Sequence, residues 1–443
     1  MSSFKILLAI IISGLALVFA IDFKIFFLLV LFLLILILPF SLFNRKYLFF
    51  IILIPFFLLP QLDRYHILPI LSWAIALYII CLLTIFIFTK IRLDNSYNFL
   101  FLLFLVFIFF EASRGWSYGY TTRYVFGETI KYLLYPVGFY FTYSIINNDS
   151  SDDKFLHDIL ILFIAFGLII SLQILYYYFN ITLGNRVITR QANLLIISFI
   201  SALAYMLFYS KKAISKLLLI ISMVIYLLST IIMMQRSLWI GFIISIILFI
   251  FLFQLKFEKR KMKILIVLLI IFLVIFGSYN LFQKIALDQS VLEERTEVFE
   301  QKEKTFSIEV RILSYFHALR LFSQNPIIGK GMGHSIITPY LNRREIGIVD
   351  NSYLVVLWKL GIIGILIFTI IYIKFISQLI KIINKTKYKM SRLFGIIIFS
   401  IMIGQMINGL ACVVMTLYYF NIIWGVFIAI TDYLYRKEFK LNE

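Results

Sequence analysis

The stretch Asp350-Asn-Ser-Tyr-Leu-Val-Val-Leu-Trp-Lys-Leu-Gly361-Ile-Ile-Gly364 marks the point where a long polar segment passes into an apolar helix. Before it come a glycine-rich turn, Gly329-Lys-Gly-Met-Gly333-His334, and a basic helical segment that carries Arg311 and Arg320. A polar site is therefore joined directly to a membrane anchor. This junction decides which kind of membrane protein to expect.

The composition excludes a water-soluble globular protein, because 63% of the 443 residues are hydrophobic and only 14% are charged. The formal charge of +19 would suit a nucleic-acid-binding protein. In a membrane protein, however, an excess of Lys and Arg is expected because it fixes the topology, so we predict no nucleic-acid partner. Cys81 and Cys412 both lie in apolar runs, so neither a disulfide framework nor a metal cluster is expected.

Apolar runs of about 17–25 residues are long enough to cross a bilayer as helices. We predict an all-α integral membrane protein with about fourteen (12–14) transmembrane helices and one large external loop. The candidate spans are 6–21, 25–43, 47–62, 67–88, 98–112, 128–146, 157–179, 192–209, 214–233, 238–255, 264–282, 353–373, 393–411 and 415–434. The first is interpreted as a retained helix, because it lacks a small-residue cleavage site.

The basic loops fall on one side of the membrane when these spans alternate. We expect that side, with both termini, to be cytoplasmic. The chain then divides into residues 1–282 with eleven spans, the external loop 283–351, and residues 352–443 with three spans and a cytoplasmic tail. Within the loop, residues 308–322 are predicted to form an amphipathic helix that ends at Asn325-Pro326.

Arginines are unexpectedly frequent on the external side, where the positive-inside rule predicts few. They come from separate loops: Arg114, Arg123, Arg186, Arg190, Arg236, Arg311, Arg320, Arg343 and Arg344. Extension of each side chain to the lipid headgroups is the simple alternative. A convergent set indicates a substrate that bears phosphate, because a guanidinium binds two phosphate oxygens at once.

Several motifs that would point to other chemistry are missing from the sequence. It contains no P-loop, Asp-x-Asp, His-Glu-x-x-His or Cys-x-x-Cys motif, so ATP hydrolysis and a divalent-metal site have no support. We therefore expect no cofactor. If phosphate chemistry occurs, arginines must neutralise the charge that a metal would otherwise meet.

Three segments within residues 186–364 resemble the O-antigen ligase and polymerase superfamily of bacterial surface-polysaccharide assembly. They are Arg186 to Asn193, Gln235-Arg236-Ser237-Leu-Trp239, and the run from Arg311 to Gly333. The external re-entry is similar to a family pattern of His-Asn, nine residues and Gly-x-x-Gly. Asn351, Gly361 and Gly364 keep that spacing, whereas Asp350 replaces the histidine. Arg320, followed by ten residues and then Gly331, is also similar to a polymerase loop motif.

The resemblance implies a GT-C-like architecture and a metal-independent glycosyltransferase in the bacterial cytoplasmic membrane. Because Asp350 replaces the ligase histidine, we predict a polymerase that joins undecaprenyl-diphosphate-linked repeat units at the outer face. Its partners would be the lipid-linked oligosaccharide donor and acceptor and bilayer lipids, with a chain-length regulator and a flippase as further candidates.

Roles follow for the individual site residues. Diphosphate binding is assigned to Arg186, Arg190, Arg236, Arg320, Arg114 and Arg123. Asp350, His334 and Arg311 are the catalytic candidates, Glu345 is a third candidate base, and Asn351 and Tyr315 belong to the same site. A carboxylate beside arginines is a weak base unless desolvation strengthens it.

Simpler interpretations stand beside these. Asp350-Asn351 is also a suitable N-cap for span 353–373, and the glycine run is also a suitable plain turn after a helix. His317 is expected to be a packed face residue, and the tryptophans Trp239, Trp358 and Trp424 are expected to be interfacial anchors. Another glycan ligase and a polysaccharide flippase are the alternative functions; a flippase is expected to show two similar halves, and none are seen.

Overall fold

The computed structural model describes residues 97–146, 152–180, 193–210, 212–233, 235–257, 304–335, 349–412 and 418–439. All regular secondary structure in these ranges is helical. Six of the described helices are long and apolar enough to cross a membrane. The protein is therefore a multi-pass membrane protein whose described part is all-α. The predicted spans before residue 97 and the span 264–282 lie outside the described residues, so the total of about fourteen stays a prediction.

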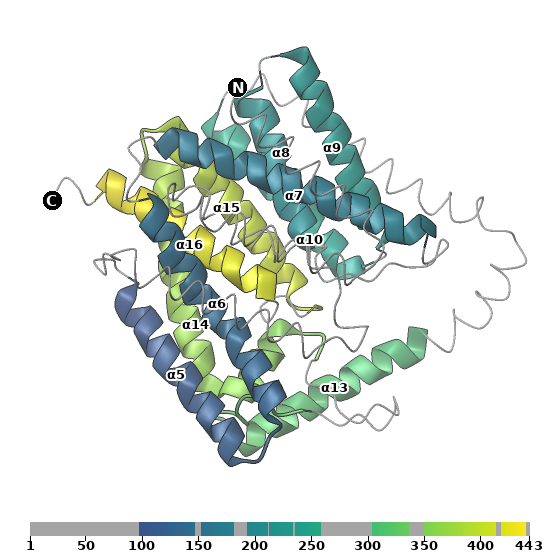
Figure 1. Cartoon of the computed structure of the whole chain (residues 1–443), viewed down its shortest axis with the longest axis vertical. Coiled ribbons are helices and arrows are strands. Elements are labelled where there is room, and N and C mark those ends of the chain that lie inside the picture. Colours follow the sequence, from purple (N-terminus) through teal and green to yellow (C-terminus); the bar gives the residue numbers. More distant parts are fainter. Residues whose placement is uncertain are drawn as a thin grey trace, which may run out of the picture.

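The described helices follow one another along the chain as Figure 1 shows. In order they are α5 (Asn98–Ser117), α6 (Thr122–Ile146), α7 (Asp152–Asn180), α8 (Asn193–Phe208), α9 (Ala213–Ile232), α10 (Arg236–Lys256), α13 (Lys304–Gln324), α14 (Ser352–Lys385), α15 (Lys389–Asn408) and α16 (Tyr418–Phe439). Every predicted span within the described ranges corresponds to one of these helices. The predicted amphipathic helix is α13, which ends just before Asn325-Pro326 as expected.

Several of the described helices are longer than the predicted spans. α5 and α6 extend toward each other beyond the spans 98–112 and 128–146, and α14 extends twelve residues past 373. Apolar runs measure only the length in contact with lipid, whereas a helix continues into the headgroup and water layers, where charged residues are tolerated. The 34 residues of α14 correspond to about 50 Å of helix, which exceeds the hydrocarbon core of about 30 Å.

Glycines allow the closest helix crossings. A Cβ on Gly425 of α16 would collide with the backbone of α6, and a Cβ on Gly241 of α10 would collide with the backbone of α15 at Gly404. Close backbone approach at small residues is the usual way in which membrane helices gain packing energy, because lipid gives little hydrophobic drive for helix association. α6 with α16, and α10 with α15, are accordingly the most extensive helix pairs.

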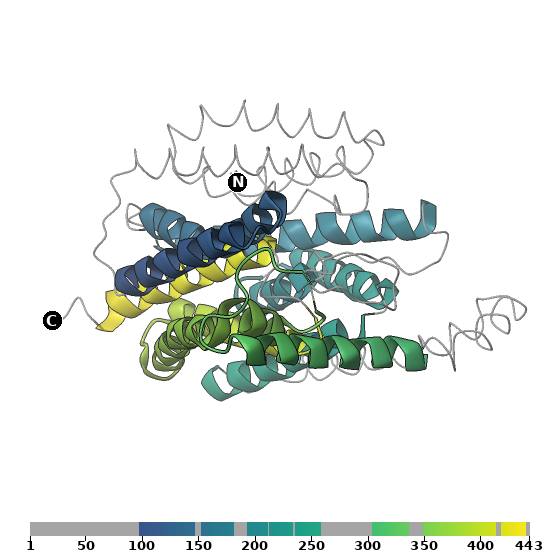
Figure 2. The same cartoon turned by 90° about the horizontal axis from the view of Figure 1, so that it is seen from below.

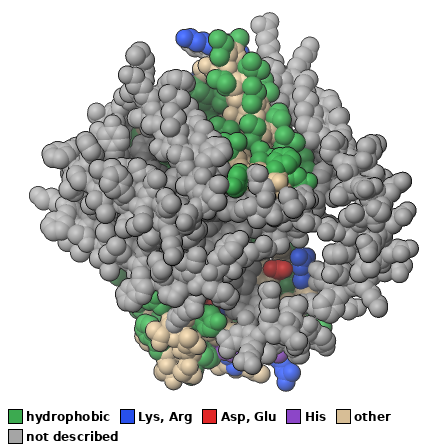
Figure 3. Space-filling model, turned by 45° about the vertical axis from the view of Figure 1, so that its right-hand side comes forward, with side chains coloured by type: hydrophobic (Ala, Val, Ile, Leu, Met, Phe, Trp, Pro, Cys, Tyr) green, Lys and Arg blue, Asp and Glu red, His purple; other side chains and the backbone are tan. Residues whose placement is uncertain are grey.

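The outer surface of α9 is apolar, as expected for a surface that faces lipid. Its exposed side chains include Ile214, Leu217, Leu218 and Ile221. In the view of Figure 3 the described side chains form a hydrophobic area in the upper part of the molecule, whereas acidic and basic side chains lie next to one another in the lower part.

The helix ends that are predicted to be external meet at one place. Gln405 near the end of α15 donates to the carbonyl of Asn193 at the start of α8 (2.9 Å), and Ser352 N at the start of α14 donates to the carbonyl of Gly409 (2.9 Å). α13 lies along one edge of the described helices and packs against α14 (Figures 1 and 2). Segments from three separate loops are therefore gathered at the same end of the bundle.

α14 is interrupted at Gly361, which has a φ of 65° and a ψ of −164° inside the helix. The carbonyls of Trp358 and Lys359 accept hydrogen bonds from the amides of Lys330 (2.9 Å) and Gly331 (3.0 Å). In return, the amides of Ile362 and Ile363 donate to the carbonyls of Pro326 (2.9 Å) and Ile327 (3.1 Å). The segment after α13 thus replaces the helical hydrogen bonds that the break removes.

Gly361→Ala is expected to destabilise the protein strongly, because the added Cβ would collide with the carbonyl oxygen of Ile327 and would also suffer the strain of a positive φ. Gly119→Ala is the matched control, since Gly119 has a φ of 76° but no heavy atom within 4 Å of the added Cβ. Thermal unfolding in detergent should show a small loss of melting temperature for Gly119→Ala and a much larger loss for Gly361→Ala. Equal losses would mean that the loop does not pack against the break.

Candidate functional site

The segment 325–334 forms a loop that is seated between α5, α6 and the break in α14; we call it the glycine loop. Gly329, Gly331 and Gly333 all have positive φ angles (68°, 89° and 83°), which only glycine adopts without strain. Met332 between them is fully buried. The interpretation as a plain turn is therefore incomplete, because the turn is packed into the core of the protein.

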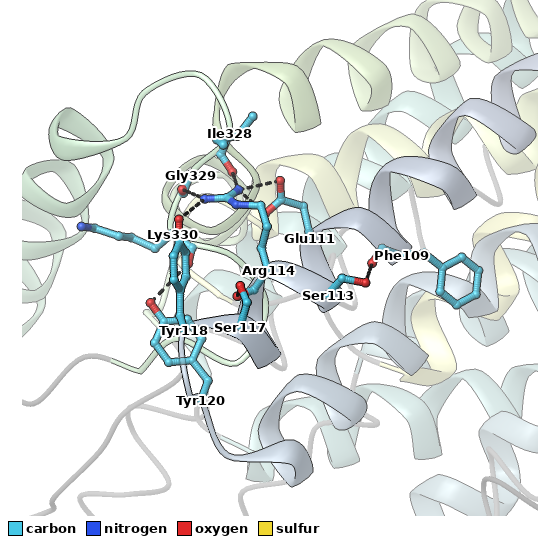
Figure 4. Close-up of polar contacts among 10 residues, drawn as sticks. All are labelled: Phe109, Glu111, Ser113, Arg114, Ser117, Tyr118, Tyr120, Ile328, Gly329 and Lys330. Carbon is cyan, nitrogen blue, oxygen red and sulfur yellow. Dashed lines mark hydrogen bonds and ion pairs between the residues drawn. The ribbon is translucent and has the colours of Figure 1, made fainter.

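Arg114 at the end of α5 fastens one side of the glycine loop (Figure 4). Its guanidinium pairs with the fully buried carboxylate of Glu111 (2.7 Å) and donates to the carbonyls of Ile328 and Gly329 (3.0 Å each). The same group lies over the ring of Tyr118 at 5.5 Å. This structural role was not foreseen from the sequence, where Arg114 was assigned to diphosphate binding; that assignment stays a prediction.

A second buried ion pair fastens the other side. The ammonium of Lys359, which is 2% exposed, pairs with the carboxylate of Glu128 on α6, and the other oxygen of that carboxylate accepts the amide of Gly333 (2.8 Å). Sequence reasoning overlooked both residues. The available signal was their position in apolar runs, because an ionisable side chain at membrane depth usually has a partner and a function.

His334 follows directly and is half-buried between two aromatic rings. Its imidazole lies edge-on to Tyr120 (5.3 Å between centroids) and to Trp358 (5.3 Å). Burial, with the nearby charges of Lys359 and Lys330, lowers the pKa of His334 to about 4. Among the described residues Nδ1 of His334 has no hydrogen-bond partner. The ring is therefore neutral at physiological pH and has a nitrogen available to accept a proton or a hydrogen bond.

Arg311 and Asp350 form an ion pair nearer the solvent. Nε of Arg311 lies 3.3 Å from Oδ2 of Asp350, and the two side chains are 50% and 54% exposed. One turn along α13, the hydroxyl of Tyr315 donates to the backbone carbonyl of Asp350 (2.8 Å). Burial raises the pKa of Tyr315, and the charge of Asp350 raises it further, so the phenol stays protonated.

Apolar packing fixes this pair in place. Ala318, Val349, Val355 and Trp358 form a small buried cluster between α13 and α14, with Tyr315 packed at its edge. Tyr315 and Ala318 are three residues apart, so they lie on the same face of α13. The face that carries the polar side chains toward Asp350 is therefore the face that is anchored.

Asn351 is the N-cap of α14, which confirms the simpler interpretation for this residue. Its Oδ1 accepts the amides of Tyr353 and Leu354 (3.0 Å each), and its Nδ2 donates to the carbonyl of Leu410 (2.9 Å). Asn351 therefore joins the start of α14 to the segment after α15. Its role in the site is at least that of a structural clamp.

The turn before α10 is attached to the same place. The side chain of Gln235 donates to Sγ of Cys412 (3.1 Å), and the hydroxyl of Ser352 donates to the carbonyl of Cys412 (2.8 Å). The backbone of Arg236, the first residue of α10, is thereby brought near the residues that follow Asp350. Two segments that are remote in sequence, and that both carry the family resemblance, meet at Cys412.

Residues 221–369 match the family described as O-antigen ligase. The resemblance to the O-antigen ligase and polymerase superfamily is confirmed. The matched superfamily segment runs from α9 to α14 and includes Arg236, Arg311 and the break at Gly361. No curated protein matches the chain.

The predicted superfamily site thus divides into two groups. Asp350, Arg311, Tyr315 and Asn351 lie together in an outer group around the starting end of α14. His334 and Arg114 lie at the glycine loop with the carboxylates of Glu111 and Glu128, in an inner group. Trp358 joins the two groups, since it packs against α13 and against His334.

The remaining predicted residues are placed less completely. Arg320 is exposed on α13, and only the backbone of Arg123 on α6 is described. Arg186, Arg190 and Glu345 lie outside the described residues. Within the described part of the chain, no three His, Cys, Asp or Glu side chains are grouped to hold a metal ion.

Two simpler expectations are wrong. His317 is exposed on α13 rather than packed, because Tyr315 and Ala318 form the packed face. Trp358 and Trp424 are not interfacial anchors: they are 0% and 1% exposed and pack among helices. A tryptophan in a helix that crosses other helices gains more by burial than by contact with the headgroups.

Two arginine-to-alanine variants should separate the inner and outer groups. Arg311→Ala removes an exposed ion pair and is expected to cost at most about 1 kcal/mol of folding free energy. Arg114→Ala leaves the buried carboxylate of Glu111 unpaired and is expected to cost about 3–5 kcal/mol. Melting temperatures in detergent should therefore fall far more for Arg114→Ala. Equal effects would contradict the division.

Proposed function

We propose that this protein is a polymerase that joins lipid-diphosphate-linked oligosaccharide repeat units at the outer face of the bacterial cytoplasmic membrane. The observation that carries the proposal is the pair of Arg311 with Asp350 at the position where the similar ligases have histidine. A carboxylate held by an arginine is suited to orienting that guanidinium. We therefore assign Asp350 to this orienting role and not to the proton transfer that the ligase histidine is expected to perform.

The reaction makes one bond and breaks one bond. The hydroxyl oxygen of the acceptor sugar bonds to the anomeric carbon of the donor, while the bond from that carbon to the phosphate oxygen breaks. The lipid diphosphate leaves with the electron pair, and the hydroxyl proton passes to a base. Negative charge develops on the leaving phosphate, so a guanidinium that meets two phosphate oxygens lowers the barrier.

The outer group is suited to hold a diphosphate. Nε of the Arg311 guanidinium faces Asp350, so its two terminal nitrogens can bind phosphate oxygens. It is half exposed, and it lies on α13 one turn before Tyr315, which packs against the buried cluster with α14. Arg236 begins α10 near Ser352, so it is the natural second arginine.

His334 is the base that we favour. It is neutral, it has an unpartnered Nδ1 among the described residues, and its ring is held by Tyr120 and Trp358. A base with a pKa of about 4 accepts a proton only as the leaving group departs, so it acts late along the reaction.

A ligase is the alternative function, and the description of the matched family favours it. A ligase needs one lipid diphosphate as donor, whereas a polymerase binds two, on the donor and on the acceptor. The many external arginines support the polymerase, because each diphosphate carries charge that must be neutralised.

Purified protein in lipid nanodiscs should extend lipid-linked repeat units into a ladder of longer chains without ATP or added metal. Chelation with EDTA should leave the rate unchanged, since the arginines neutralise the phosphate charge. Loss of activity on chelation, with recovery on addition of magnesium, would overturn the arginine mechanism. Transfer only to a lipid A core or a protein acceptor would identify a ligase instead.

Arg311→Lys is expected to reduce polymerisation about as much as Arg311→Ala, because an ammonium is a point charge that cannot replace the planar fork. A decrease of about tenfold or more corresponds to one lost charge-assisted hydrogen bond. Lys381→Arg at the other end of α14 serves as the control for expression and folding. Full activity of Arg311→Lys would mean that Arg311 acts as a membrane-surface charge and not as a phosphate ligand.

A further inference from the structure

The ion pair of Glu128 and Lys359 joins α6 to α14, and it also contacts the surroundings of His334. Each residue is joined to a neighbour of His334: Glu128 accepts the amide of Gly333, and Lys359 adjoins Trp358 in α14. The ammonium of Lys359 also lies over the Trp358 ring at 4.8 Å, and that ring meets the imidazole edge-on. The pair therefore bears on both the backbone and the side chain of His334.

The backbone at Gly333 is held tightly. Its φ of 83° is accessible to glycine, and a Cβ there would collide with Val125, one turn before Glu128 on α6. The hydrogen bond to Glu128 then fixes the Met332–Gly333 peptide, one residue before His334, against α6. Tyr120 and Trp358 limit the remaining rotation of the ring.

We propose that Glu128 and Lys359 are positioning residues that hold His334 in one orientation and in its uncharged form, ready to accept the proton of an acceptor hydroxyl. This inference rests on the proposed function for the role of His334 as base. The orientation and charge state of the ring can be tested without it.

The charges around His334 come from four elements. Lys359 on α14, Lys330 in the glycine loop and His317 on α13 act to lower the pKa of His334, and Glu128 on α6 acts to raise it; burial is the largest cause of the decrease. Glu128 and Lys359 thus shift the pKa of His334 in opposite directions. Removal of the Lys359 charge alone should therefore raise the pKa of His334, whereas removal of a charge remote from the histidine should leave it unchanged.

The charge state of the imidazole can be followed by NMR on the full-length protein in detergent, with isotope-labelled histidine. The signal of His334 is assigned as the one that disappears in His334→Gln. The wild-type ring is expected to stay neutral from pH 8 down to about pH 5, because its pKa is about 4. Lys359→Met should raise the pKa by about one unit or more, the usual effect of a close charge, so that protonation enters this range. Glu128→Gln, whose amide oxygen can still accept from Gly333, should keep the ring neutral.

Lys381→Met, the same substitution at the far end of α14, is the matched control and should leave the His334 signal unchanged. If Lys359→Met does not fold, the double variant Glu128→Gln/Lys359→Met removes both charges and tests the same point. It should change the chemical shift of His334 through the altered hydrogen bond to Gly333. Unchanged shifts and unchanged titration in all these variants would overturn the proposal.

The rate of glycan transfer against pH separates this proposal from the proposed function. If His334 is the base, the loss of activity toward acid should move to higher pH in Lys359→Met, together with the NMR titration. A shifted titration with an unmoved rate profile would uphold the positioning role and reject His334 as the base. An unmoved titration in folded Lys359→Met would reject the influence of the pair on the charge of His334, whatever the activity.

Discussion

The hydrogen bonds between the glycine loop and the break in α14 at Gly361 are the constraint on which the rest of the described structure depends. A helix break at membrane depth exposes backbone groups, and each unsatisfied one costs several kcal/mol in hydrocarbon. The glycine loop supplies the missing partners through two amides and two carbonyls. The break and the loop are therefore stable only together, and the loop in turn sets where α13 and His334 lie.

Charge is used in two ways around this junction. The pairs of Arg114 with Glu111 and of Lys359 with Glu128 are buried, and they fasten the loop to α5 and α6. Such pairs make the arrangement specific, because removal of one partner leaves a buried charge. The pair of Arg311 with Asp350 is half exposed and contributes little to stability, so it is free to exchange partners with an anionic substrate. The two inner pairs therefore hold the glycine loop rigidly, whereas the outer pair of Arg311 and Asp350 can change partners.

The sequence allowed much of the fold to be predicted, because apolar length, the N-cap Asn351 and the stop at Asn325-Pro326 are local signals. The break at Gly361 could not be predicted, since a glycine in an apolar run has the same local signal whether or not a remote loop completes it. The pairing of Glu128 with Lys359 depends on the packing of α6 against α14, which no spacing encodes. The sequence assigned Arg311 and Asp350 to the same site, and the structure places them side by side. It assigned His334 to that site as well, and only the tertiary contacts show that His334 lies in a separate inner group.

Hydrogen exchange at single-residue resolution tests the junction most directly. If the loop and the break form one unit, the amides of Lys330 and Gly331 should be protected as strongly as those of Ile362 and Ile363, and all four should open together. Thr121, which is exposed in the turn between α5 and α6, provides the reference. Exchange of Lys330 and Gly331 as fast as that reference, with Ile362 and Ile363 still protected, would contradict the union of the glycine loop with the break in α14.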